Sequence, residues 1–118
     1  MPIIEIDALA PSEPFDLGAA LTHVTTAVAA FLEEEPRGTW AIFHPVAPGH
    51  FAEGDDAPHE QPADTHPAIV RVFANREPDQ IQPLLAVVAH AVVTAFGLQE
   101  GNVFVRCEPA DPSRMYWG

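Results

Sequence analysis

The sequence contains no lysine. Its five cationic residues are all arginines, set against seventeen aspartates and glutamates, which gives a formal net charge of −12. Proteins that bind nucleic acids or anionic lipids without sequence preference use clustered lysine and arginine to contact phosphate groups. The scarcity of cations therefore argues against both partners, and we expect no nucleic acid and no membrane.

Cysteine and long apolar runs are also scarce. The one cysteine, Cys107, has no second thiol for an internal disulfide, which is typical of a reducing compartment, and we interpret it as an inert, buried thiol. The apolar stretches fall short of the roughly 20 consecutive residues that a membrane-spanning helix needs. The first residues lack the basic and apolar regions of a signal peptide. We therefore expect a cytoplasmic protein.

The residues that are present suffice for one domain of 118 residues, because 47% of them are hydrophobic. Alternating, β-branched segments predict four strands. These strands cover residues 2–7, 39–46, 67–74 and 102–108. Pro45 and Pro48 are expected to end the second strand, because proline cannot donate to a ladder of hydrogen bonds.

Two apolar stripes at three- and four-residue spacing predict amphipathic helices. The first helix is expected to start at Ser12-Glu13-Pro14 and to end near the acidic run 33–35. The second is expected to start at Glu77-Pro78-Asp79 and to end at Gly97, where a left-handed cap is typical. Each helix thus lies between two predicted strands.

The two halves of the chain repeat this pattern, since PIIEIDALA at Pro2 aligns with PAIVRVFAN at Pro67. Right-handed crossovers make each half a parallel βαβ unit. We predict an α/β domain over 1–118: a four-stranded sheet with both helices on one face. Its parts are listed in chain order: βαβ 2–46, a mobile loop 47–66, βαβ 67–108 and a tail 109–118. The second face of the sheet is left without cover, which favours an oligomer.

Six histidines raise the question of a metal site, but four of them, in or beside the long loop, are separated by six, nine and seven residues. Such gaps match no tight ligand motif. The sequence also lacks the GxSxG, P-loop and GxGxxG motifs. We expect neither a metal ion nor an organic cofactor.

Pro2 is the residue with the clearest chemical potential. If the initiator methionine is removed, the chain begins with a secondary amine at the start of a strand. A free α-amino group titrates near pH 8, and burial or a neighbouring arginine lowers its pKa toward neutrality. At that pKa, an amine serves as an efficient general acid or base.

MPIIEI before a duplicated βαβ unit, together with the segments VFANREPDQ and AFGLQEGNVFV, resembles the tautomerase superfamily. This group includes 4-oxalocrotonate tautomerase, macrophage migration inhibitory factor, malonate semialdehyde decarboxylase and the cis-3-chloroacrylic acid dehalogenases. The resemblance covers essentially the whole chain in element order and length. It implies a homotrimeric barrel with pockets between subunits, and a catalytic N-terminal proline, Pro2.

The resemblance also implies a carboxylate-binding arginine, Arg76. A guanidinium suits this role because its planar fork holds a carboxylate with two bonds, although an ion pair with Glu77 or Asp79 is the simpler alternative. A second arginine is often found two or three residues further on, where this chain has Pro78 and Asp79.

Phe104 and Arg106 share one face of the last strand, where the family places pocket-lining side chains. Arg106 is a candidate for the second cation, or it pairs with an acid such as Glu5 of another copy. Arg71, among apolar neighbours, is interpreted as a structural ion-pairing residue. Trp40 and Tyr116 are candidates for pocket walls.

Two departures weaken the hydrolytic branches of the family. The run directly before the tyrosine, Arg114-Met115-Tyr116, holds no acid, where the dehalogenases carry a water-activating carboxylate, and Arg37 or Gly38 replaces the aspartate of the decarboxylase. We therefore expect a tautomerase or isomerase acting on a 2-oxo acid or enol that bears a carboxylate. Two alternatives stay open: a dehalogenase, hydratase or decarboxylase of a three-carbon acid, and a non-catalytic binding protein.

Overall fold

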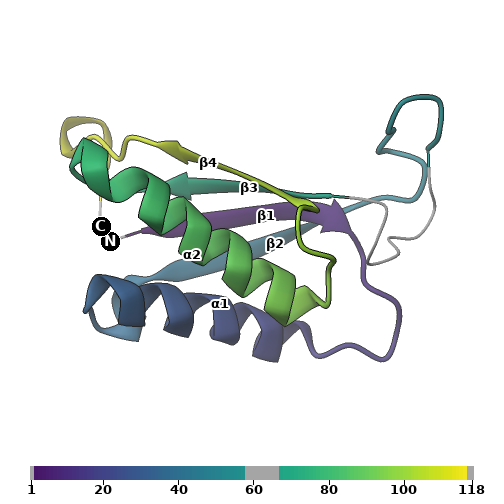
Figure 1. The fold of residues 1–118 in the computed structure, drawn as a ribbon, viewed down its shortest axis with the longest axis horizontal. Helices are drawn as coiled ribbons and strands as arrows, with labels where there is room; N and C mark the ends of the chain where they lie inside the picture. Colours follow the sequence, from purple (N-terminus) through teal and green to yellow (C-terminus); the bar gives the residue numbers. More distant parts are fainter. Residues whose placement is uncertain (1, 58–66, 117–118) are drawn as a thin grey trace.

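A computed structural model describes residues 2–57 and 67–116 and shows a two-layer α/β arrangement (Figure 1). Its elements in chain order are β1 (Ile3–Leu9), α1 (Leu17–Leu32), β2 (Trp40–Val46), β3 (Ala68–Phe73), α2 (Pro78–Phe96) and β4 (Val103–Glu108), with 3-10 turns at Pro36–Gly38 and Pro112–Arg114. The strand order is β2-β1-β3-β4. β1 and β2 are parallel, β3 and β4 are parallel, and β1 is antiparallel to β3. The predicted fold class of two tandem βαβ units is confirmed.

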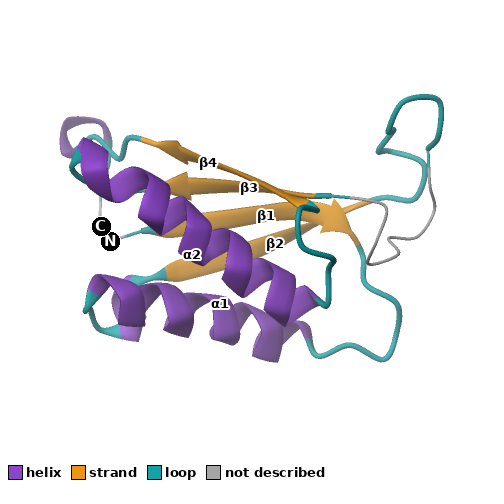
Figure 2. Cartoon of the chain, viewed as in Figure 1, coloured by secondary structure: helices purple, strands orange, loops and turns teal. Residues whose placement is uncertain are grey.

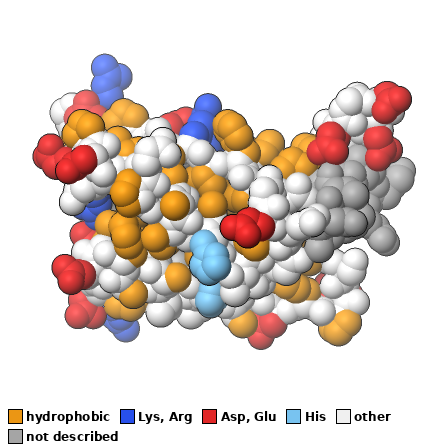
Figure 3. All heavy atoms as spheres, in the orientation of Figure 1, with side chains coloured by type: hydrophobic (Ala, Val, Ile, Leu, Met, Phe, Trp, Pro, Cys, Tyr) orange, Lys and Arg blue, Asp and Glu red, His pale blue; other side chains and the backbone are white. Residues whose placement is uncertain are grey.

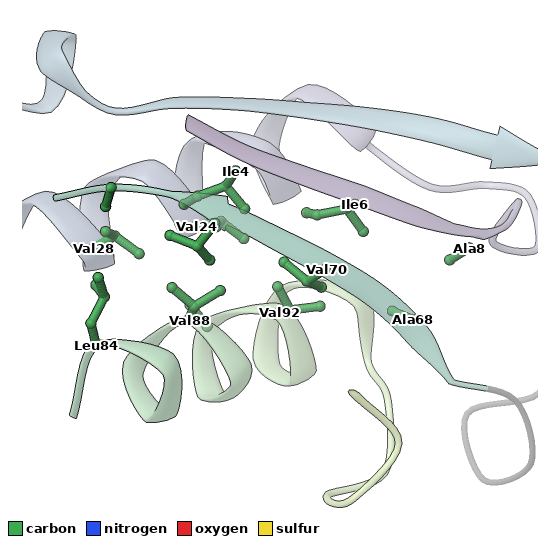
Figure 4. Close-up of a cluster of buried hydrophobic side chains, with 13 residues drawn as sticks. Ile4, Ile6, Ala8, Val24, Val28, Ala68, Val70, Leu84, Val88 and Val92 are labelled. Carbon is green, nitrogen blue, oxygen red and sulfur yellow. The ribbon is translucent and has the colours of Figure 1, made fainter. Parts of the chain in front are cut away.

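Both helices lie on one face of the sheet (Figure 2). Every second residue of the central strands points toward them, and the facing side chains of α1 and α2 complete a fully buried core (Figure 4). The largest members of this core, all 0% exposed, are Ile4, Ile6, Val24, Val28, Val70, Val72, Leu84, Val88 and Val92. α2 is long and apolar enough to cross a membrane by length and composition alone, but here its apolar stripe packs into this core.

The helix starts differ from each other. α1 begins at Leu17, later than expected, because the Asp16 carboxylate caps it by accepting a bond from the Ala19 N–H at 2.9 Å. α2 begins as predicted, with Glu77 as its N-cap and Pro78 in its first turn. Pro14 and Pro78 are therefore not equivalent. Gly97 ends α2 with φ 65°, the left-handed cap expected there.

Two further expectations are corrected by the sheet. Pro45 lies inside β2, opposite Ala8, and does not end the strand. β2 is an edge strand, so a residue without an N–H is tolerated there. The alignment of the two halves also shifts by one residue: it pairs Ile4, which is 0% exposed, with Ile69, which is 39% exposed on the opposite face.

The long connection after β2 contains a turn at its described end. Glu53 and Asp56 exchange two backbone hydrogen bonds, at 2.7 and 3.1 Å. The remainder of the predicted loop, 58–66, lies outside the described residues. Its mobility stays a prediction.

The face of the sheet away from the helices is named the open face here. Alternation and register place on it the side chains of Ile3, Glu5, Asp7, Trp40, Ile42, His44, Ile69, Arg71, Phe73, Phe104, Arg106 and Glu108. Four of its large apolar side chains are substantially exposed, from 39% for Ile69 to 61% for Phe104. An apolar surface with a charged centre favours contact with other copies, and the predicted oligomeric barrel stays a prediction.

Candidate active site

Pro2 lies at the start of β1, between β2 and β3, with its side chain buried. Its carbonyl oxygen accepts a hydrogen bond from the Trp40 N–H at 3.1 Å. Ile3 pairs with Trp40 on one side and with Phe73 on the other, so one step further along the register brings Pro2 beside Thr39 and Ala74. The sheet therefore fixes this residue on both sides.

Arg76 follows Ala74 by two residues and reaches the same end of the sheet. Its side chain is 21% exposed, and its Nη2 lies 3.0 Å from Oε2 of Glu34, a residue just beyond α1. The Nε of Arg76 is buried and has no hydrogen-bond partner among the described residues. The guanidinium is thus only partly satisfied within the chain.

Asn75 fixes the segment that carries Arg76. Its side-chain amide donates to the carbonyl oxygen of Ala110, and its Oδ1 accepts from the N–H of Ala110 at 3.0 Å. These two bonds tie the end of β3 to the segment after β4. A hollow of about 240 Å³ is lined here by Ala74, Asn75, Arg76, Ile81, Cys107 and Pro109. A protein cavity of about 150 Å³ holds benzene, so this hollow is large enough for a small organic acid beside Arg76. Neither Pro2 nor Thr39 is among its lining residues.

Thr39, on the other side of Pro2, is 4% exposed, and its hydroxyl has no partner within residues 2–57 and 67–116. A buried hydroxyl without a partner costs about 1–3 kcal/mol. Thr39 lies beside Pro2 on the β2 side, and Arg76 follows two residues after Ala74 on the β3 side. The Thr39 hydroxyl oxygen and the Arg76 Nε are both buried and have no hydrogen-bond partner among residues 2–57 and 67–116.

Sequence patterns did not indicate Thr39 or Glu34. Thr39 precedes a strand without any motif, and Glu34 belongs to a run of three acids that looks like the end of a helix. The pairing of Glu34 with Arg76 joins residues 42 positions apart, and the predicted alternative partners, Glu77 and Asp79, were wrong. No local signal identifies such a contact.

The structure does not bring Arg106 and Phe104 to Pro2 within one chain. Arg106 pairs in register with Arg71, which is opposite Glu5, and Phe104 lies two residues further away. At about 3.4 Å per residue, Arg106 is therefore about 10 Å from Pro2 along the strands alone. Its guanidinium binds Glu108 of its own strand at 2.7 Å.

The two aromatic candidates differ in their surroundings. Trp40 adjoins Pro2 through its backbone, and its side chain, 51% exposed, stands on the open face. Tyr116 is 92% exposed, so it walls no pocket in this chain alone. Trp40 is the better-placed of the two.

Arg71 has the structural role predicted for it. Its Nη2 lies 3.3 Å from a carboxylate oxygen of Glu5 and 3.3 Å from one of Asp7. The second oxygen of Asp7 lies 3.0 Å from Nδ1 of His44. This network occupies the centre of the open face.

Within the part of the chain that the structure describes, no group of three histidine, cysteine or acidic side chains is placed to hold a metal ion. His59 and His66 lie outside that part. Burial raises the pKa of the Cys107 thiol, a backbone hydrogen bond with Ala74 lowers it in part, and the charge of Glu108 raises it further. The thiol is therefore held in its neutral form beside Arg76.

No family model and no curated protein sequence matches the chain. Its fold is that of the tautomerase superfamily, as the sequence resemblance predicted. A fused 4-OT solved as an asymmetric trimer is similar with a TM-score of 0.81 and 8% identity, over 98% of this chain and 92% of that one.

Two other solved structures extend the likeness. Pt0534, inactivated by 2-oxo-3-pentynoate, has a TM-score of 0.76 and 17% identity over 96% of this chain and 89% of that one. A malonate semialdehyde decarboxylase, described for its decarboxylase and hydratase activities, has a TM-score of 0.73 and 12% identity over 98% and 90%. At these identities the likeness establishes the fold but not the activity, which must be inferred from the residues of the site.

Proposed function

We propose that this chain is a cofactor-independent tautomerase. In this proposal the Pro2 amine, freed by removal of Met1, transfers a proton between carbon and oxygen of a 2-oxo acid or its enol. The observation that carries the proposal is the position of Pro2 at a strand end, between the buried hydroxyl of Thr39 and the segment that bears Arg76. The inactivation of Pt0534, a protein of the same fold, by a 2-oxo acid supports this substrate class.

The chemistry needs a base near the α-carbon and a cation or donor where charge develops. The amine of Pro2 accepts the proton from the enol oxygen or the α-carbon and returns it to the other atom. Arg76 holds the substrate carboxylate with its planar fork. The Thr39 hydroxyl is the nearest donor by register for the carbonyl or enol oxygen.

The proposal includes a homotrimer. The exposed apolar side chains of the open face support it, as does the trimeric fused 4-OT of the same fold. In a trimer, the open face of one copy can bring Arg106 and Phe104 to the Pro2 of another. This is the arrangement that gives those two residues a role in the site, and sedimentation measures the number of copies.

The test compares two forms of the protein whose first residue is verified by mass spectrometry. The form without Met1 is expected to convert phenylenolpyruvate to phenylpyruvate, and a form that retains Met1 is expected to be inactive because its proline nitrogen is an amide. Equal rates from both forms would remove Pro2 from the mechanism.

A hydratase or decarboxylase is the second candidate, because a decarboxylase with hydratase activity shares the fold. That chemistry uses the amine in its cationic form as an acid. NMR titration of the Pro2 nitrogen separates the two: an amine that is neutral at pH 7 supports the tautomerase, and one still protonated at pH 8 supports the second candidate. A protein inactive in both assays would favour the non-catalytic binding alternative.

A further inference from the structure

Arg76 already has a carboxylate partner inside the chain. The Glu34 Oε2 lies 3.0 Å from its Nη2, and the two side chains are 37% and 21% exposed. The Nε of the same guanidinium has no hydrogen-bond partner among the residues that the structure describes. The contact is thus incomplete: it uses one nitrogen of a fork that binds carboxylates best with two.

The Glu34 carboxylate competes with any acidic ligand for the Arg76 guanidinium, because both are negatively charged. A substrate carboxylate that approaches Arg76 either displaces Glu34 or shares the guanidinium with a second negative group. Both routes lower the affinity for an acid, and neither affects a neutral molecule of the same shape. Along the left edge of Figure 3, where α1 ends and α2 begins, acidic and basic side chains alternate, so this end of the molecule is not a uniformly positive basin.

We propose that Glu34 is a specificity-determining residue: it competes with the substrate carboxylate for Arg76 and so sets how strongly the site prefers an acid to its neutral ester. The inference rests on the proposed function of Arg76 as the carboxylate anchor. It predicts that acids bind with lowered affinity, so a substrate acid must be abundant enough to displace an internal carboxylate.

The chain offers a matched control. Glu33, Glu34 and Glu35 are consecutive, yet Glu34 is the member of the run that pairs with Arg76. Glu34→Gln and Glu35→Gln remove the same charge one residue apart. A difference between these variants therefore reports the contact and not the general field of the acidic run.

The experiment measures kcat and KM with phenylenolpyruvate and with its methyl ester, and the Kd of 3-phenylpropionate, an acid that cannot tautomerise. Glu34→Gln is expected to lower the KM and Kd of the acids about 3- to 5-fold, the range of a partly exposed ion pair. The ester is expected to be unaffected, and Glu35→Gln to have less than half the effect. Thermal melting verifies that the variants are folded.

The Glu34→Gln substitution is also measured in the Arg76→Gln variant. If Glu34 acts through Arg76, Glu34→Gln changes the KM no more than Glu35→Gln does once the arginine is gone, and the Glu34 and Arg76 substitutions are strongly non-additive. A KM for the acid that stays the same or rises in Glu34→Gln overturns the proposal, because it shows that Glu34 does not compete for Arg76 or instead orients it.

The binding measurement separates the two proposals. If the wild type shows no turnover but Glu34→Gln still tightens 3-phenylpropionate, the tautomerase proposal fails and the competition at Arg76 stands. If turnover depends on Pro2 while Glu34→Gln alters neither KM nor Kd, the tautomerase proposal stands and Glu34 is not a specificity determinant.

Discussion

The two βαβ halves share one backbone plan but carry opposite charges where they meet. The first half supplies the acids of the ion pairs that cross between them, Glu5, Asp7 and Glu34, and the second supplies the arginines, Arg71 and Arg76. Hydrophobic periodicity alone would permit each half to pair with a copy of itself. The complementary charges distinguish the β1–β3 pairing from those alternatives, and they position Arg76 at the proposed site.

The halves also differ at their first residue. Pro2 and Pro67 each precede a strand of the sheet, and the proposed function requires that Pro2 become a chain terminus with a free amine. The side chain of Pro2 is buried, whereas that of Pro67 is partly exposed. Both prolines therefore stand at the start of a strand, and the proposed proton transfer uses Pro2 alone.

The largest effect on activity is expected from substituting Pro2, the proline of the first half. Pro2→Ala should lower kcat/KM for phenylenolpyruvate by about 100- to 10,000-fold, the contribution of a positioned general acid or base, with some activity left because alanine also provides a terminal amine. Pro67→Ala is the matched control and should leave the rate within about twofold. A Pro2→Ala rate equal to that of the wild type would refute the catalytic role.

The second largest effect concerns the arginines. Arg76→Gln should raise the KM for an acid about 10- to 100-fold, because a hydrogen bond to a charged group contributes about 1.5–3 kcal/mol. Arg114→Gln, in the tail and 85% exposed at its side chain, is the control, and Arg37→Gln should also have little effect. Because Arg106 lies far from Pro2 in one chain, a raised KM in Arg106→Gln would indicate a site completed by a neighbouring copy.

Removing Arg71 tests the charge complementarity itself. Arg71→Met leaves Glu5 and Asp7 without their shared partner, and the free energy of unfolding should fall by about 1–2 kcal/mol, because these side chains are only about one-third exposed or less. Urea unfolding measures the change. The triple variant that also carries Glu5→Gln and Asp7→Asn should recover most of the loss, and a further loss would show that the network is not held by charge.

The periodic patterns predicted the sheet and helices, since alternation and three- to four-residue spacing are local properties. The predicted start of α1 at Ser12 was wrong because Ser12 and Asp16 are both good helix caps. Pro45 was expected to end β2 but lies inside it, because a sequence does not reveal which strand lies at an edge of the sheet. The catalytic role of Pro2 is a prediction from its place in the chain. The contact between Glu34 and Arg76 and the unpaired hydroxyl of Thr39 were not predictable, because both depend on segments brought together only by the fold.

Thr39→Val should separate function from stability. Replacing a buried hydroxyl that has no partner with a methyl group of the same shape should raise the free energy of unfolding by about 1 kcal/mol, while lowering kcat with the acid and the ester alike. Thr39→Ser should restore kcat. Asn102, which precedes β4 as Thr39 precedes β2, is only partly buried, so loss of its side chain should not raise stability. A fall in stability in Thr39→Val would show that the hydroxyl has a partner after all.

The smallest effect is expected at Cys107, which lies on the second half beside Arg76. Burial and, to a lesser degree, the charge of Glu108 raise its pKa, so at pH 8.5 iodoacetamide should alkylate the native thiol more slowly than the urea-unfolded one. The native rate should continue to rise at pH values where the unfolded rate has levelled off. Because the folded thiol keeps its proton to a higher pH than the unfolded one, its contribution to stability is complete below the unfolded pKa and is lost as the pH rises through the folded pKa. Glu108→Gln removes the charge of Glu108, the weaker of the two causes that raise the pKa, and should shift the pH profile of native alkylation slightly toward lower pH. A larger shift would show that charge, and not burial, is the main cause of the raised pKa.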